Sequence, residues 1–131
     1  TYLIYTFMSR IPEELKYTKT HEWFSVDAGV ATIGISDYAQ QQLTDIVYID
    51  MPKPGDDKKI GDVLLTIESV KSAEDVYSPV NGKVIEINME LEKSPELVNE
   101  DPYKNWIVKI KLDDEKYNFL TAEEYKKYIG E

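Results

Sequence analysis

The chain has 131 residues, enough for one hydrophobic core but short for two, and 42% of them are hydrophobic, as in an ordinary globular domain. Its 25 acidic and 15 basic residues give a formal net charge of −10, which disfavours binding to nucleic acid and to anionic membranes. The absence of cysteine and the single histidine, His21, exclude disulfides, thiolate metal sites, cysteine nucleophiles and multi-histidine metal sites. This charge provides solubility or favours basic patches on partner proteins.

Residues 1–7 are apolar but lack the basic segment and the cleavage site of a signal peptide. Because Met8-Ser9 resembles a native start, we expect residues 1–7 to be an added segment and residues 8–131 to form one domain. Nowhere do apolar residues continue for the roughly 18 positions that a membrane-spanning helix needs.

Alternation of apolar and polar residues with a period of two predicts half-buried strands in several segments. The alternating apolar positions are Ala31, Ile33 and Ile35; Val47, Ile49 and Met51; and Trp106, Val108, Ile110 and Leu112. A further strand is expected at 83–87, after the turn signal at 78–82. The chain is therefore expected to be mainly β.

Helix signals are few and short. Ser36 is an expected N-cap for a brief helix over 38–43, and Ser94 followed by Pro95 predicts a single helical turn. Thr121 and Glu124 form a capping box, which predicts a C-terminal helix over about 121–129.

An internal similarity relates two segments of the chain. Residues 46–51 (IVYIDM) match residues 84–89 (VIEINM) at every position except Tyr48 against Glu86. The two copies lie on either side of a predicted hairpin over 63–80. This layout predicts a flattened barrel or sandwich of two similar halves related by a pseudo-two-fold axis, with the hairpin tip exposed.

Lys71 lies at the tip of that hairpin. The turn, 69–72, lacks the Asn-Gly or Asp-Gly pair that favours tight turns, which suggests that its side chains serve something other than folding. A lysine there extends its amine away from the protein and is suited to modification or to presenting a cofactor. The alternative is an ordinary solvated surface lysine.

The segment around Lys71 resembles the lipoylation motif of the glycine cleavage system H protein family. The motif residues are Glu68, Ser69, Val70, Lys71 and Ser72. Further blocks similar to the family, in the same order, are 15–17 with 20–23, 30–35 with 38–40, 78–84 and 99–103. The resemblance covers roughly residues 12–130.

This resemblance implies a carrier and not an enzyme, with the fold of lipoyl and biotinyl carrier domains. Lipoic acid would be joined to Lys71 through an amide bond, attached by a lipoate-attaching enzyme. The implied partners are a pyridoxal-phosphate glycine decarboxylase (the P protein), a tetrahydrofolate-dependent aminomethyltransferase (the T protein) and a dihydrolipoamide dehydrogenase with FAD and NAD (the L protein). The carrier is expected to be a monomer in the bacterial cytoplasm, or in the mitochondrial matrix if the source is eukaryotic.

The resemblance also places Thr20, His21, Glu22 and Asp75 beside a cleft for the aminomethyl-lipoyl arm. Water can cleave the aminomethyl thioether, so a carboxylate that binds its cationic amine would favour the protected state. Glu22 is the expected carboxylate, and Thr20 could add a hydroxyl acceptor. The alternatives are a packing role for His21 and a solvated surface position for Glu22.

Four other functions compete with this interpretation. The carrier could relay octanoyl or lipoyl groups to other lipoyl domains, or it could carry biotin, although Val70 and Ser72 replace the methionines that flank a biotinylated lysine. It could instead be an unmodified interaction module, for which Lys71 would be dispensable. An enzyme is the least supported, because no nucleophile–base pair or metal cluster is evident.

Overall fold

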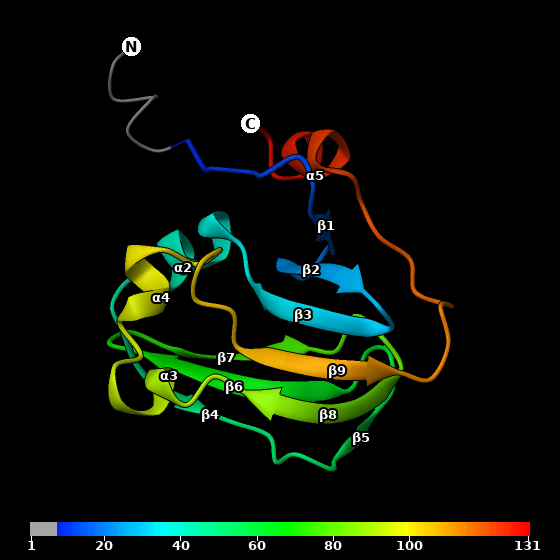
Figure 1. Ribbon diagram of the computed structural model, residues 1–131. Coiled ribbons are helices and arrows are strands. Elements are labelled where there is room, and N and C mark those ends of the chain that lie inside the picture. Colours follow the sequence, from blue (N-terminus) through cyan, green and yellow to red (C-terminus); the bar gives the residue numbers. More distant parts are fainter. Residues whose placement is uncertain (1–7) are drawn as a thin grey trace.

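The computed structural model describes residues 8–131, which form two antiparallel sheets with short helices at their edges (Figure 1). The expected added segment, 1–7, lies outside the described residues. The strands are β1 (Lys16–Tyr17), β2 (Glu22–Asp27), β3 (Val30–Ile35), β4 (Ile46–Asp50), β5 (Asp57–Lys58), β6 (Val63–Ser69), β7 (Ala73–Tyr77), β8 (Gly82–Ile87) and β9 (Val108–Leu112). The helices are α2 (Asp37–Leu43), α3 (Glu90–Lys93), α4 (Leu97–Glu100) and α5 (Ala122–Tyr128).

The two sheets share one hydrophobic core. The six-stranded sheet has the order β1-β2-β3-β9-β8-β5, and the three-stranded sheet has the order β4-β6-β7. The core includes Ile33 and Ile110 from the larger sheet and Leu65 and Ile67 from the smaller one, all at most 3% exposed. The predicted mainly β sandwich with short helices and a C-terminal helix is confirmed. None of the helices within 8–131 is long and apolar enough to cross a membrane.

The predicted internal similarity corresponds to equivalent places in the two sheets. The order β4-β6-β7 in one sheet corresponds to β8-β9-β3 in the other, so the two similar segments form the equivalent strands β4 and β8. Both strands carry a bulge at the same position, between Ile46 and Tyr48 in β4 and between Val84 and Glu86 in β8. The similarity therefore extends to the irregularities of the backbone.

The bulge in β4 overturns one detail of the strand prediction. Alternation placed Val47 on the buried face with Ile49, but Val47 is 53% exposed and Ile46 is buried in its place. A bulge adds one residue to one strand of a pair and so changes which side chains face the core.

Two of the three predicted helix starts are confirmed. The Ser36 side chain caps α2 by accepting from the Ala39 amide, and Thr121 with Glu124 forms the capping box of α5. The prediction at Ser94-Pro95 was wrong in position: Ser94 ends α3 by donating its amide to Glu90, and α4 begins only at Leu97. The four-residue helix that precedes Ser94 already uses it as a C-cap.

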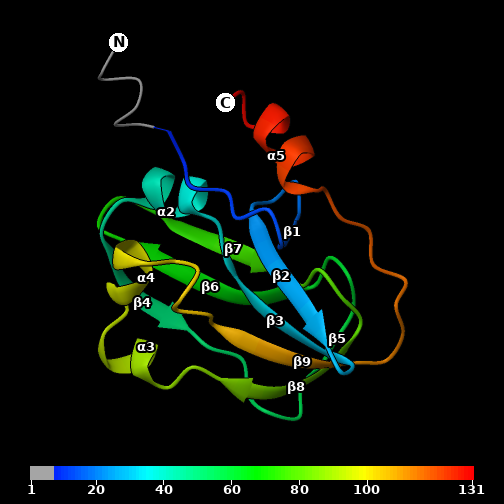
Figure 2. The same cartoon turned by 45° about the horizontal axis from the view of Figure 1, so that its top comes forward.

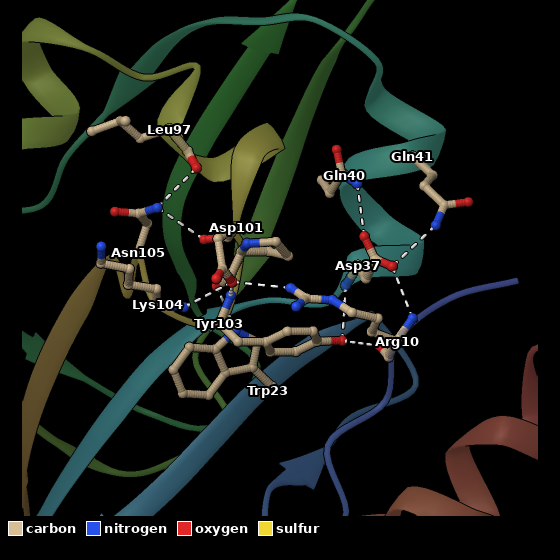
Figure 3. Close-up of polar contacts among 11 residues, drawn as sticks. Arg10, Trp23, Asp37, Gln40, Gln41, Leu97, Asp101, Tyr103, Lys104 and Asn105 are labelled. Carbon is tan, nitrogen blue, oxygen red and sulfur yellow. Dashed lines mark hydrogen bonds and ion pairs between the residues drawn. The ribbon is translucent and has the colours of Figure 1, made fainter. Parts of the chain in front are cut away.

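A polar cluster fixes the start of the described chain against α2 (Figure 3). The Arg10 amide donates to Asp37 Oδ2 at 2.8 Å, and its guanidinium donates to Asp101 Oδ1 at 3.0 Å. The Tyr103 hydroxyl donates to the Arg10 carbonyl and accepts from the Asp37 amide at 3.0 Å. Burial raises the pKa of Tyr103 to about 12, so this hydroxyl remains a donor at neutral pH.

Candidate functional site

The β6–β7 hairpin is closed by a four-residue turn that Ser69 stabilises. The two strands pair from Val63 with Tyr77 to Glu68 with Ala73, and the Ser69 amide donates to the Ser72 carbonyl at 2.8 Å. The Ser69 hydroxyl oxygen accepts from the amides of Ser72 at 3.1 Å and Lys71 at 3.3 Å. The expectation of a turn without turn-forming residues is thus corrected, because a serine hydroxyl can organise a turn in place of glycine.

Lys71 is exposed at the tip of this hairpin, on a rigid base. Ile67 and Val76, one on each strand, are 0% and 5% exposed and belong to the core. The Val70 amide donates to the Asp45 carbonyl at 3.0 Å, which ties the turn to the residues before β4. The turn lies at the same end of the sheets as α2 and α4 (Figures 1 and 2). The lysine is therefore presented on a fixed platform.

A cavity of about 310 Å³ opens beside the turn, between β7, α2 and the residues before β2. We call it the tip pocket. Its apolar part is formed by Ile35, Leu43 and Val76, with Tyr38 and Ala39 of α2. Its polar part comes from Ser72, Glu74, Asp75, Thr20, His21 and Gln42. The structure thus brings together three of the four predicted cleft residues, Thr20, His21 and Asp75, next to the lysine-bearing turn.

Glu22, the fourth predicted cleft residue, lines a different cavity of about 330 Å³. Thr20 lines both cavities, so the two adjoin at this residue. The Glu22 side chain is 1% exposed, so the alternative of a solvated carboxylate was wrong. Glu22 Oε1 accepts from the hydroxyls of Thr18, at 2.6 Å, and Thr20, and Oε2 accepts from the Tyr77 amide at 3.1 Å. Burial raises the pKa of Glu22, and these hydrogen bonds act in the opposite direction.

His21 is half-buried in an aromatic environment. Its φ of 75° is in the left-handed region, and its ring lies 4.9 Å from that of Tyr38. Its Nδ1 lies 2.9 Å from the Tyr125 hydroxyl, which in turn lies 2.7 Å from the Ser36 hydroxyl. Burial lowers the pKa of His21. From the sequence, Ser36 was identified only as a helix cap, and Tyr125 was not identified. The apolar periodicity of a short helix can show that one face is buried, but it does not show which residues that face contacts.

Asp75 differs from Glu22 in exposure. It is exposed on β7, and its Oδ1 accepts from the Thr66 hydroxyl at 3.0 Å across the hairpin. Together with the exposed Glu74, it gives the tip pocket a negative rim. This arrangement suits an arm with an apolar body and a cationic end.

Comparison with known proteins identifies a family that this chain resembles over most of its length. The family model described as glycine cleavage H-protein matches residues 15–131. A probable glycine cleavage system H protein of Picrophilus torridus is 67% identical over 124 residues, covering 95% of this chain and all of the relative. A probable H protein of Thermoplasma volcanium is 64% identical, covering 93% of this chain and 99% of the relative.

Among solved structures, the crystal structure of a glycine cleavage system H protein from Mycobacterium marinum is similar, with a TM-score of 0.87 and 28% identity. The match covers 92% of this chain and 100% of that one. Sequence and fold therefore indicate the same family over nearly the whole chain.

Proposed function

The chain belongs to the glycine cleavage H-protein family, and on that premise we propose that Lys71 carries lipoic acid through an amide bond. Family membership supports a lipoyl-carrier role in the glycine cleavage system. The observation that carries the assignment to this residue is the exposed lysine on a rigid hairpin tip with a partly apolar pocket beside it. A flexible arm on a fixed platform can visit several active sites and return to its own protein.

The residues around Lys71 support recognition by an attaching enzyme. Ser69 holds the turn in shape through its hydroxyl, and Val70, 65% exposed, donates its amide to the Asp45 carbonyl. Glu68 is exposed one residue before the turn, so its carboxylate is accessible to a basic group on the enzyme. Ser72 joins the turn to the tip pocket. The motif would thus be read as a shaped turn and not as an extended peptide.

The tip pocket would protect the loaded arm. The dithiol end of a lipoyl group is apolar, and an aminomethyl group on its sulfur is cationic. The pocket offers both an apolar wall and the carboxylate of Asp75. Thr20 would add a hydroxyl, held in place by its bond to Glu22. Any direct contact of the amine with Glu22 would use the remaining lone pair of Oε2, from the adjoining cavity.

The proposed cycle follows from this carrier role. The arm would receive the aminomethyl group at the P protein, deliver its one-carbon unit to tetrahydrofolate at the T protein, and be reoxidised at the L protein. The chain would act as a monomer, and its net charge of −10 favours basic docking surfaces on these partners. The named relatives come from prokaryotes, which supports the cytoplasm as its location.

The test is intact mass with peptide mapping after incubation with lipoate and a lipoate-attaching enzyme. We expect one lipoyl adduct on the Lys71 peptide of the wild type and none in Lys71→Arg. Lys104→Arg, which changes another exposed lysine, should keep the adduct. An adduct spread over several lysines, or none at all, would refute the proposal and favour an unmodified interaction module. Transfer of an octanoyl group from Lys71 to a second lipoyl domain would reveal the relay function.

A further inference from the structure

Three side chains from distant parts of the sequence form a hydrogen-bonded chain that ends at the tip pocket. The Ser36 hydroxyl oxygen accepts from the Ala39 amide at 3.1 Å and lies 2.7 Å from the Tyr125 hydroxyl. The Tyr125 hydroxyl lies 2.9 Å from Nδ1 of His21, whose ring lines the pocket. Tyr125 is 0% exposed, and its ring stacks on that of Tyr17 with centroids 4.7 Å apart. The Ser36 and Tyr125 hydroxyls are therefore shielded from solvent and held in place.

The direction of these hydrogen bonds follows from Ser36. Its side chain is 0% exposed, and among residues 8–131 its hydroxyl has hydrogen-bond contacts only with the Ala39 amide and the Tyr125 hydroxyl. Since the amide can only donate, the proton of Ser36 must go to the Tyr125 oxygen. Tyr125 then donates to His21 Nδ1. This order makes Nδ1 an acceptor and places the proton of neutral His21 on Nε2.

Protonation of His21 would reverse this order. An imidazolium carries a proton on Nδ1 and must donate to Tyr125, which would then donate to Ser36. The Ser36 proton would remain buried without an acceptor. Such an orphaned group costs about 1.4 kcal/mol or more, the equivalent of tenfold. The geometry thus opposes positive charge on His21, and burial lowers its pKa in the same direction.

Several other titratable groups surround His21. They are Lys19 and Glu22 on its own segment, Tyr38 on α2, Glu74 and Asp75 on β7, and Tyr125 and Tyr128 on α5. The carboxylates Glu74 and Asp75 favour an imidazolium, while Lys19 disfavours it. The hydroxyl chain therefore has a specific task, which is to keep His21 neutral beside a negative rim.

We propose that Tyr125 and Ser36 are positioning residues that hold His21 neutral, with its proton on Nε2, so that the tip pocket keeps its negative charge for a cationic carried group. The position of the proton depends only on the contacts above. The consequence for a carried amine rests on the proposed function. An imidazolium in the pocket would repel the aminomethyl cation and offset the attraction of Asp75.

The first test is the protonation state of His21 by nuclear magnetic resonance of the imidazole nitrogens in the unmodified full chain. His21 is the only histidine, so its signals need no assignment. We expect the Nε2-protonated form to exceed the other neutral form at least about tenfold in the wild type. Tyr125→Phe should reduce this excess several-fold and raise the pKa of His21. A wild type with its proton on Nδ1, or a Tyr125→Phe protein identical to it, would overturn the proposal.

The matched control is Tyr17→Phe, which removes another buried tyrosine hydroxyl, one that donates to the Pro12 carbonyl at 2.7 Å. It should leave the His21 signals unchanged, because the Tyr17 ring stacks on Tyr125 while its hydroxyl donates to Pro12, away from the hydroxyl chain. A change as large as in Tyr125→Phe would show that general loosening, and not the hydroxyl chain, sets the proton. Ser36→Thr, which keeps the hydroxyl and the cap, should preserve the wild-type signals where Ser36→Ala does not.

The second test follows decay of the aminomethyl-loaded protein across pH. The ratio of the decay rate in Tyr125→Phe to that in the wild type should be near one at pH 8 and rise several-fold as the pH falls below about 6.5. The same ratio at every pH would overturn the pocket-charge consequence. If Lys71 cannot be loaded at all, the proposed function fails and this consequence falls with it. The nitrogen signals still decide the position of the proton.

Discussion

Replacing Glu22 by alanine is expected to lower the free energy of unfolding by about 2 kcal/mol. The carboxylate is 1% exposed and accepts three hydrogen bonds. The Tyr77 amide would lose its acceptor, at about 1–3 kcal/mol, while the partly exposed hydroxyls of Thr18 and Thr20 can bond to water at little cost. The cavity left by the side chain adds roughly 1 kcal/mol, and relief of a buried charge offsets about as much.

Thermal unfolding followed by circular dichroism measures this effect. For a chain of 131 residues, a loss of about 2 kcal/mol corresponds to a Tm lower by about 7 °C. Glu74→Ala is the matched control, because Glu74 is an exposed carboxylate on β7 that also lines the tip pocket. It should change the Tm by about 2 °C or less. A Glu22→Ala protein as stable as the control would refute the conclusion that the Glu22 carboxylate links β2 to β7 through the Tyr77 amide.

The same variant tests the proposed role of Glu22 in protection of the arm. Lipoylation of Lys71 should proceed as in the wild type, because the turn is far from the lost bonds along the hairpin. Hydrolysis of the loaded aminomethyl group should be faster, since Thr20 loses the partner that fixes its hydroxyl. Equal decay rates in the variant and the wild type, measured below the Tm of both, would exclude that role.

Three further changes have defined outcomes. Gly82→Ala should cost about 3 kcal/mol in urea unfolding, because a Cβ there would clash with the Lys111 carbonyl oxygen. A cost below about 1 kcal/mol would contradict this close approach. Because the pKa of His21 is lowered in the folded protein, the unfolded chain binds the His21 proton more tightly than the folded one does. The wild type should therefore lose stability as the pH falls below about 6.5, by at most about 1.4 kcal/mol per pH unit. This loss should be absent in His21→Asn, which tolerates a positive φ, and an unchanged pH dependence in that variant would contradict the assignment to His21. Ser69→Ala should lower the free energy of unfolding by about 1 kcal/mol and slow lipoylation several-fold, since the Ser69 hydroxyl shapes the turn. Ser72→Ala keeps the backbone bonds of the turn and should be lipoylated like the wild type. Equal lipoylation rates in the two variants would contradict this role of Ser69.

Much of the fold could be predicted because period-two alternation records which face of a strand is buried. Ala31, Ile33 and Ile35 alternate in the sequence and are all at most 3% exposed in β3. The internal similarity between 46–51 and 84–89 could likewise be read directly, and it predicted equivalent strands in two sheets. Helix starts were predictable where a cap acts locally, as at Ser36 and Thr121, because those bonds span only three residues.

Three features were missed because a residue far along the chain decides the local structure. The bulge at Val47 depends on how β4 pairs with β6, and nothing within 46–51 indicates it. The burial of Glu22 depends on Tyr77, which is 55 residues away. The partner of His21 lies on the last helix, 104 residues away. Family resemblance named His21 and Glu22 but could not show what holds them.

Polar bridges, and not apolar packing alone, hold the walls of the tip pocket together. Glu22 joins β2 of the larger sheet to β7 of the smaller one, and Tyr125 joins α5 to the residues before β2 and to the start of α2. The Glu22 carboxylate and the Tyr125 hydroxyl are both buried, so each has lost its contacts with water. Hydrogen-bond partners held in fixed positions compensate for that loss. In the proposed carrier, whose arm would leave and return, these bridges would keep apolar walls from closing over an empty pocket. On the proposed function, stability and arm protection would depend on the same residues, and variants that remove single hydroxyls, such as Tyr125→Phe against Tyr17→Phe, would help to separate them.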